Sequence, residues 1–261
     1  MLSESVGLEK QGYIAILRLN RPDDLNALNY ETLVQLGEKI EELRLDVKET
    51  RVVILTASGK AFSAGADLKE RRTLNEQQVR RNVNKIREVC TLLERLPQPT
   101  IAAMNGHAFG GGLELTLSCD FRYAVRGAKL GLTEVSLGII PGAGGTQRLP
   151  RLIGIAKAKE WILTARRVDV EEALGCGLLQ GVAEDQEHLM ELYQQLASEI
   201  LANAPLAVYQ AKYAVDRGYS VDMQTGLDLE AKAYEVIIPT QDRIEALEAF
   251  REKRKPIFRG E

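Results

Sequence analysis

Apolar and polar positions along the first two-thirds of the chain follow two alternating patterns. Four short apolar runs are typical of buried strands: 13–19, 52–56, 100–104 and 121–125. Between them, apolar residues recur every three or four positions over 30–49 and again over 74–96, which predicts helices. A further short helix is expected over 113–118, directly after a run of glycines. Strands that alternate with helices in this way predict an α/β architecture with a buried sheet.

The last third of the chain loses the strand pattern and predicts helices almost throughout. Pro205 is placed to open one of these helices and Gly218 to end it. We therefore predict a layered α/β core over 1–200, which carries the active site, followed by a helical region over 201–261.

The composition fits a folded protein that does not favour a polyanionic partner. Of the 261 residues, 45% are hydrophobic, which is enough for a sizeable core. The 34 Lys and Arg against 37 Asp and Glu leave a formal net charge of −3, whereas nucleic-acid binding draws on a surplus of basic residues. No apolar run approaches the ~20 residues that span a bilayer. We therefore expect neither nucleic acid nor a membrane as the main partner.

Cysteine and histidine usage argues against a disulfide framework and against a metal centre. The three cysteines, Cys90, Cys119 and Cys176, are odd in number and form no CxxC pair, as is typical of reduced thiols. Two histidines, His107 and His188, are too few for a His-rich metal site. The N-terminus shows no signal-peptide pattern. We expect the cytoplasm, or the mitochondrial matrix if a transit peptide has been removed.

The first segment with candidate chemistry is a run of three glycines, Gly110 to Gly112, followed by Glu114. Glycines between a strand and a helix let a ligand approach the backbone closely. The first turn of the helix offers unpaired N–H groups that stabilise an anion. A tight turn without a ligand explains the glycines alone equally well, and Glu114 could merely cap the helix. The spacing matches neither the GxGxxG fingerprint nor a Walker A loop.

Two further segments complete the candidate site. Glu134 lies in a mostly apolar stretch, where a surface role is the alternative to a buried one. Two buried carboxylates close together would raise at least one pKa, which suits proton transfer near neutral pH. Upstream, Ala64-Gly65-Ala66-Asp67-Leu68 has small residues that could let a ligand reach the backbone, although an ordinary turn with Asp67 as a helix N-cap also fits.

Taken together, these segments resemble the enoyl-CoA hydratase/isomerase (crotonase) family. The resemblance rests on ordered motifs across most of the chain: NAL at 26–28, AGADLK at 64–69, GGGLEL at 110–115, SCD at 118–120, Glu134, IPGAGGTQRLP at 140–150 and FREKR at 250–254. It implies an α/β fold of the crotonase-like (ClpP/crotonase) type, a spiral of repeated β-β-α units. The C-terminal helices would then form a trimerisation or lid region, in a homotrimer or a homohexamer made of two trimers.

The resemblance also implies the roles of the candidate catalytic residues. The backbone N–H groups of Ala66 and Gly111 would form an oxyanion hole for a thioester carbonyl. Glu114 and Glu134 would hold the reacting water; Glu134 would deliver a proton to the α-carbon, while Glu114 helps to orient and activate the water. The N–H group of Gly142 would help to place that water.

An acyl-CoA thioester is the partner that the resemblance implies, and coenzyme A would enter as part of the substrate. No metal or redox cofactor is expected. The contacts to CoA would come from six residues: Ala64, Asp67, Leu68, Lys69, Phe250 and Lys253. Of these, Phe250 and Lys253 would reach a CoA that is bound largely by a neighbouring subunit.

The presence of both glutamates favours hydration of a trans-2-enoyl-CoA to a 3-hydroxyacyl-CoA. The alternatives within the family are a Δ3-Δ2-enoyl-CoA isomerase and a methylglutaconyl-CoA hydratase, whose branch the segment after Ala66 resembles. Arginines that follow this segment could meet a distal carboxylate, although a solvated helix face explains them better: Arg71, Arg72, Arg80 and Arg81. An RNA-binding module on the same fold is the non-enzymatic alternative, but acidic residues outnumber basic ones in the first helix.

Overall fold

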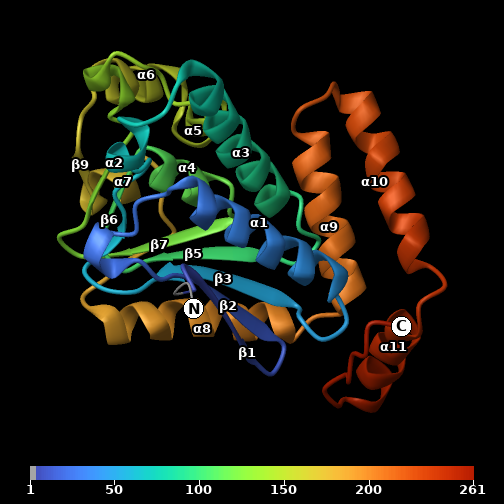
Figure 1. The fold of residues 1–261 in the computed structure, drawn as a ribbon. Coiled ribbons are helices and arrows are strands. Elements are labelled where there is room, and N and C mark those ends of the chain that lie inside the picture. Colours follow the sequence, from blue (N-terminus) through green and yellow to red (C-terminus); the bar gives the residue numbers. More distant parts are fainter. Residues whose placement is uncertain (1–3) are drawn as a thin grey trace.

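The computed structural model describes residues 4–261, and its centre is a twisted six-stranded sheet (Figure 1). The strands run in the order β1-β2-β3-β5-β7-β10. Their bounds are Val6–Gln11, Ile14–Leu19, Val52–Ala57, Thr100–Met104, Phe121–Val125 and Gly181–Ala183. Only β1 and β2 pair in antiparallel fashion, and all other neighbours in this sheet are parallel. The four strands predicted from apolar runs are therefore the middle of the sheet.

A second, smaller sheet has the order β4-β6-β8-β9. Its strands are very short: Ala61–Ser63, His107–Phe109, Lys129–Gly131 and Val168–Asp169. Each of β3, β5 and β7 in the large sheet is followed directly by a strand of the small one, β4, β6 and β8. This repeated change of sheet confirms the predicted spiral. The sequence did not predict the small sheet, because strands of two or three residues carry no measurable periodicity.

Helices cover both faces of the large sheet. On one face lie α1 (Tyr30–Leu45), α3 (Glu76–Glu94) and α4 (Gly111–Leu117), and on the other lies α8 (Gln186–Leu201), as Figure 1 shows. Successive side chains of a strand point to opposite faces. Accordingly Val53 and Leu55 of β3 pack into the larger core with α1, while Val52 and Ile54 pack into the smaller core with α8.

The remaining elements of the core are short. They are η1 (Pro22–Asp24), α2 (Leu68–Arg71), η2 (Glu134–Leu137), α5 (Gly145–Ile153), α6 (Ile155–Leu163) and α7 (Val170–Gly175). The helix predicted from residue 74 begins at Glu76, because Asn75 and Gln78 form a reciprocal capping box there. The helix predicted from 113 begins at Gly111, and the one predicted to 49 ends at Leu45. No helix within 4–261 is long and apolar enough to cross a membrane.

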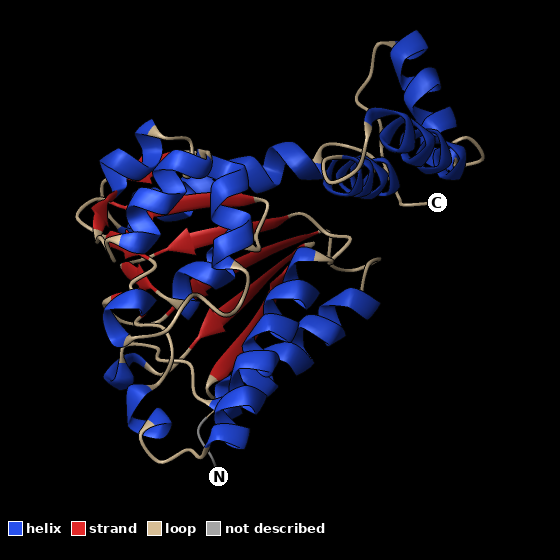
Figure 2. Ribbon diagram, turned by 90° about the horizontal axis from the view of Figure 1, so that it is seen from above, coloured by secondary structure: helices blue, strands red, loops and turns tan. Residues whose placement is uncertain are grey.

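Three helices follow the core and lie to one side of it: α9 (Pro205–Gly218), α10 (Met223–Ile237) and α11 (Gln241–Glu252), as Figure 2 shows. Pro205 and Gly218 bound α9 as predicted. The Tyr209 hydroxyl of α9 donates to the Val47 carbonyl at 3.1 Å, and Lys212 forms a 2.7 Å ion pair with Asp120. These contacts attach α9 to the core. The role of 201–261 as a separate trimerisation or lid region stays a prediction.

Candidate active site

The loop that precedes α2 lies beside the loop that precedes α1. Leu28 N–H donates to the Gly65 carbonyl at 2.8 Å, and Asp67 N–H donates to the Leu28 carbonyl at 3.1 Å. The N–H group of Ala66, between these two bonds, has no acceptor within residues 4–261. Gly65 has φ +89°, and a Cβ there would lie 2.8 Å from the Phe109 carbonyl oxygen, so only glycine fits. The loop therefore packs closely against Phe109 and carries one free backbone donor, the Ala66 N–H.

A second free donor lies next to the first. Gly111 is the first residue of α4, where a backbone N–H has no acceptor within the helix. A Cβ on Gly111 would lie 4.0 Å from the Ala66 nitrogen, and a Cβ on Gly65 would lie 3.4 Å from the Gly111 nitrogen. The Ala66 and Gly111 N–H groups are therefore neighbours at the positive end of a helix, an arrangement that suits one developing oxyanion.

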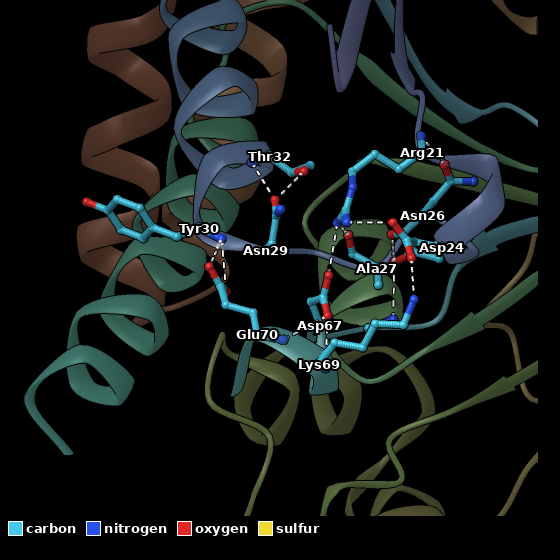
Figure 3. A network of polar contacts seen from close by, with 12 residues as sticks. Arg21, Asp24, Asn26, Ala27, Asn29, Tyr30, Thr32, Asp67, Lys69 and Glu70 are labelled. Atoms are coloured by element: carbon cyan, nitrogen blue, oxygen red, sulfur yellow. Dashed lines mark hydrogen bonds and ion pairs between the residues drawn. The ribbon is translucent and has the colours of Figure 1, made fainter. Parts of the chain in front are cut away.

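A polar network holds the first of these loops in place, as Figure 3 shows. The Arg21 guanidinium donates to the Ala27 carbonyl at 2.6 Å and pairs with Asp67 at 3.1 Å and with Asp24 at 2.7 Å. Lys69 pairs with Asp24 at 2.8 Å. Arg21 therefore contacts both loops, and it links the segment that carries Ala66 to the segment that carries Leu28.

Asn26 also stabilises the loop that precedes α1. It is 2% exposed and has φ +53°, a conformation that asparagine tolerates better than most residues. Its side chain accepts from Arg21 N–H and donates to the Ser58 and Ala61 carbonyls, all at 2.8 Å. The Ser63 hydroxyl donates to the Asn26 carbonyl, also at 2.8 Å. Hydrogen bonds thus fix the backbone where the chain approaches Gly111.

Glu114 lies in the first turn of α4 and is 3% exposed. Its Oε1 accepts from the N–H groups of Ala143 and Gly145, each at 2.8 Å. Burial raises the pKa of Glu114, and the two N–H donors, followed by the charges of Arg148 and Arg87, oppose that rise. The surface capping role left open by the sequence is therefore excluded by the burial of this side chain.

Glu134 opens η2 and is 9% exposed. Burial, followed by the negative charge of Glu114, raises the pKa of Glu134 to about 7. Its Oε2 has no hydrogen-bond partner within residues 4–261. A Cβ on Gly110 would lie 3.0 Å from the Glu134 Oε1, so the carboxyl group packs against the glycine that precedes α4. The two glutamates therefore share one buried site.

The backbone of Gly142 borders this site next to Ala143. Its N–H has no acceptor among the residues that the structure describes, and its carbonyl accepts from Arg87 Nε at 3.1 Å. The structure thus gathers five predicted residues in one region: Ala66, Gly111, Glu114, Glu134 and Gly142. Their catalytic roles remain predictions.

The residues predicted to contact CoA divide into two groups. In the segment that carries Ala66, Ala64 N–H donates to the Leu25 carbonyl, Asp67 is the N-cap of α2, and Leu68 and Lys69 are exposed. Phe250 and Lys253 lie instead at the end of α11, far from α4 in Figure 1. Phe250 is 86% exposed. A single chain does not bring this second group to the site, and a contact across subunits stays a prediction.

Sequence reasoning missed the side chains that support the site. Arg148 donates to the Ala143 carbonyl and forms a two-point ion pair with Glu94, 54 residues away. Arg148 lies within the 140–150 motif, but no local signal identifies Glu94 as its partner. Arg21 was missed for the same reason, because its contacts with Asp67 form only on folding. Within the described residues, no cluster of three or more His, Cys, Asp and Glu side chains could hold a metal.

The sequence matches the family model described as enoyl-CoA hydratase/isomerase over residues 9–261. The chain belongs to this family. Membership supports an enzyme that acts on CoA thioesters, with hydration and isomerisation both represented in the family.

Three relatives indicate the branch of the family. YngF of Bacillus subtilis (strain 168), a proposed enoyl-CoA hydratase/isomerase, is 53% identical over 252 residues, which are 96% of either chain. The mitochondrial methylglutaconyl-CoA hydratase of Homo sapiens is 44% identical over 256 residues, or 97% of this chain and 76% of that one. A crystal structure of enoyl-CoA hydratase from Bacillus anthracis has a TM-score of 0.95 at 49% identity, over 98% of this chain and 100% of that one. The predicted crotonase-like fold and branch are confirmed.

Proposed function

We propose that this protein is an enoyl-CoA hydratase that adds water across the 2,3 double bond of a trans-2-enoyl-CoA. The observation that carries the proposal is the pair of buried carboxyl groups, Glu114 and Glu134, beside two free backbone donors. Addition of water needs a group to take a proton from water and a group to give one to carbon. It also needs donors for the charge that develops on the thioester oxygen.

The thioester carbonyl would accept hydrogen bonds from the N–H groups of Ala66 and Gly111. As water attacks C3, electrons move from the double bond toward the carbonyl oxygen, which gains enolate character. Donors fixed in advance stabilise this charge more than that of the ground state. The network around Arg21 and Asn26 supports this role, because it holds the Ala66 loop rigid.

Glu134 is suited to give the proton and Glu114 to take one. A pKa of about 7 lets Glu134 keep a proton close to neutral pH, where it can donate it. Two N–H donors favour the ionised form of Glu114. In the proposed step, the water oxygen bonds to C3, its proton passes to Glu114, and the Glu134 proton bonds to C2. Proton exchange with solvent then restores both groups, and Gly142 N–H would help to place the water.

Isomerisation is the alternative reaction. Moving a double bond from position 3 to position 2 needs a single acid–base group that shifts one proton between carbons. Glu134 alone could perform that step. The second carboxyl group, held by Ala143 and Gly145, supports hydration instead, because it gives the site a place to bind and activate water.

A substrate with a distal carboxylate is a second candidate, as the methylglutaconyl-CoA hydratase similarity suggests. Arg71 of α2 favours it. This side chain is half-buried, its charge reaches Glu134, and it forms no ion pair within residues 4–261. An unpaired arginine beside a reaction centre suits a carboxylate on the acyl group.

We also propose that the protein works as a trimer or as a hexamer of two trimers. Large exposed apolar side chains on and next to the C-terminal helices support assembly; they include Tyr219, Met223, Tyr234, Leu247 and Phe250. We propose no metal or redox cofactor and no nucleic-acid partner. The compartment stays a prediction, with the cytoplasm proposed and the mitochondrial matrix as the alternative.

A turnover panel tests the proposal. The protein is assayed with crotonyl-CoA, a longer trans-2-enoyl-CoA, methylglutaconyl-CoA and a 3-enoyl-CoA, and products are separated from substrates. Formation of 3-hydroxyacyl-CoA at rates well above the uncatalysed reaction supports hydration. Conversion of the 3-enoyl thioester alone would replace hydratase with isomerase. Absence of turnover, together with tight and sequence-selective RNA retention on filters at several salt concentrations, would favour the binding module.

A further inference from the structure

The loop that binds Glu114 is held from its outer side by two arginines. The peptide between Gly142 and Ala143 is trans, as are all described peptides, so its C=O and N–H point in opposite directions. Its carbonyl accepts from Arg87 Nε at 3.1 Å, and its N–H donates to Glu114 Oε1 at 2.8 Å. A bond that pulls the carbonyl outward therefore aims the N–H inward, at the carboxylate.

Arg148 holds the next peptide, which lies between the two peptides whose N–H groups donate to Glu114. Its Nη1 donates to the Ala143 carbonyl at 2.8 Å, while Nε and Nη2 contact the two carboxylate oxygens of Glu94, both at 2.8 Å. The side chain is only 15% exposed. Two-point pairing with Glu94 fixes the orientation of the guanidinium as well as its position. Glu94 is the last residue of α3, so Arg148 connects the loop to the end of a long helix.

The loop needs such support because it is rich in glycine. Gly142, Gly144 and Gly145 have more conformations open to them than other residues. Gly144 has φ +109°, and a Cβ there would collide with the Arg148 guanidinium. The same residue that lets Arg148 approach thus also loosens the backbone. Without a grip on its carbonyls, the loop could rotate its N–H groups away from Glu114.

We propose that Arg148, anchored by Glu94 and assisted by Arg87, is a positioning residue that fixes the loop whose Ala143 and Gly145 N–H groups donate to Glu114. This inference rests on the proposed role of Glu114 in activating water. Neither arginine needs to touch substrate. We expect Arg148 to contribute more to the positioning of the loop than Arg87. Arg148 is mostly buried and fixed by three bonds, whereas Arg87 is exposed and makes one.

The surroundings of Glu114 give a readout that a purely structural role would not move. The charged and titratable groups that face it are Glu134, Cys90, Arg87 and Arg148. The two N–H bonds and the two arginine charges lower the pKa of Glu114 against the effect of burial. Their loss must therefore raise that pKa, so the ionised form would appear only at higher pH.

The test compares Arg148→Met with Arg126→Met in the full-length protein. Arg126 is a matched control, since it also forms a two-point pair, with Glu184 at 2.7 Å, but lies on the surface away from the site. Arg148→Met should lower kcat about tenfold, in keeping with a lost hydrogen bond to a charged group. KM should change by less than about twofold, and the acidic limb of the kcat/KM profile should move to higher pH. Arg126→Met should match the parent in all three.

Two milder variants keep the proposal testable if Arg148→Met does not fold. Glu94→Gln weakens the ion pair that fixes Arg148, and Arg87→Met removes the hydrogen bond to the Gly142 carbonyl. Each should change kcat and the acidic limb in the same direction as Arg148→Met, but by less. If folded variants keep the parental kcat and acidic limb, the inference is wrong. If the parent itself hydrates no enoyl-CoA, the proposed function fails separately from this inference. NMR titration of the carboxyl groups then tests the inference alone. Glu114 should titrate at higher pH in Arg148→Met than in the parent, and an unchanged titration would overturn the inference.

Discussion

Glu114 and Glu134 are the same residue type, both buried in one site, yet their surroundings differ. Glu114 Oε1 accepts two backbone N–H bonds at 2.8 Å, whereas Glu134 Oε2 has no partner among the described residues. Hydrogen bonds to a carboxylate favour its charged form, while burial without them favours the neutral form. The comparison teaches that local donors, rather than burial alone, separate a group suited to accept a proton from one suited to donate it.

The two regions also differ in their scaffolds. Glu114 lies on α4, all of whose residues are buried, and Arg148 fixes the loop facing it. Glu134 lies on the short helix η2, which is followed by Gly138; Leu137 and Ile140 nearby are exposed. Glu114, the proposed base, is thus held by hydrogen bonds, whereas Glu134, the proposed acid, is carried by a short element near the surface. Substitutions around Glu114 should alter both the geometry and the charge of the site. Substitutions around Glu134 should alter mainly its charge.

The largest effect is expected when either carboxyl group is replaced. Glu114→Gln and Glu134→Gln should each lower kcat by roughly 10²–10⁴-fold, because each removes a proton-transfer group from the transition state. Both should keep the fold and CoA binding; in Glu114→Gln the new amide oxygen can still accept from Ala143 and Gly145. Steady-state rates with crotonyl-CoA and calorimetric CoA binding measure the two quantities. A variant that hydrates crotonyl-CoA at near the parental rate has lost no catalytic group.

Removal of a backbone donor should come next. Gly111→Pro deletes one N–H at the first position of α4, where proline is tolerated, and should cost ~2.7–4 kcal/mol of transition-state stabilisation. A Cβ at this position would lie 2.5 Å from Ile86 Cδ1, so the change is best made together with Ile86→Val.

Gly111→Ala with Ile86→Val is the control, since it adds the same Cβ and keeps the N–H. We expect kcat to fall in the proline variant far more than in the alanine variant, with similar CoA affinity. Equal kcat in the two would mean that the Gly111 N–H does not stabilise the transition state.

A smaller effect concerns Arg71, beside Glu134. If the substrate carries a distal carboxylate, Arg71→Gln should lower kcat/KM for methylglutaconyl-CoA about tenfold more than for crotonyl-CoA, through loss of a charged hydrogen bond. The ratio of the two substrates cancels any effect of the Arg71 charge on Glu134. Arg80→Gln, which alters an exposed arginine paired with Glu76, is the control. An unchanged ratio would remove the distal-carboxylate candidate.

The smallest effect is on stability. Glu134 ionises near its ordinary value of 4.5 when unfolded and near 7 when folded, so the folded state holds a proton that the unfolded state has lost between these values. The free energy of unfolding therefore falls as pH rises from 4.5 to 7. Glu134→Gln removes this loss and should raise Tm by several degrees at pH 8, with little change at pH 4. Thermal unfolding at both pH values checks the sign; a lower Tm at pH 8 would contradict it.

Much of the fold and the site could be predicted because the signals are local. The apolar runs predicted β5 at 100–104 and β7 at 121–125 with their observed bounds, and the glycine run marked the start of α4. Strands of two or three residues, such as β9, have too few positions to show a period. The grip of Arg148 on Ala143 also could not be predicted, because it depends on Glu94 from a distant helix.

The central claim is that Glu134 holds its proton to near-neutral pH while Glu114 lies ionised beside it. The most direct test is a pH titration of the glutamate carboxyl carbons by NMR in the parent, Glu134→Gln and Glu114→Gln. We predict one carboxyl group that titrates near pH 7 in the parent, is absent in Glu134→Gln, and shifts to lower pH in Glu114→Gln, because a neighbouring negative charge is gone. A titration near pH 7 that persists unchanged in Glu134→Gln would contradict the account.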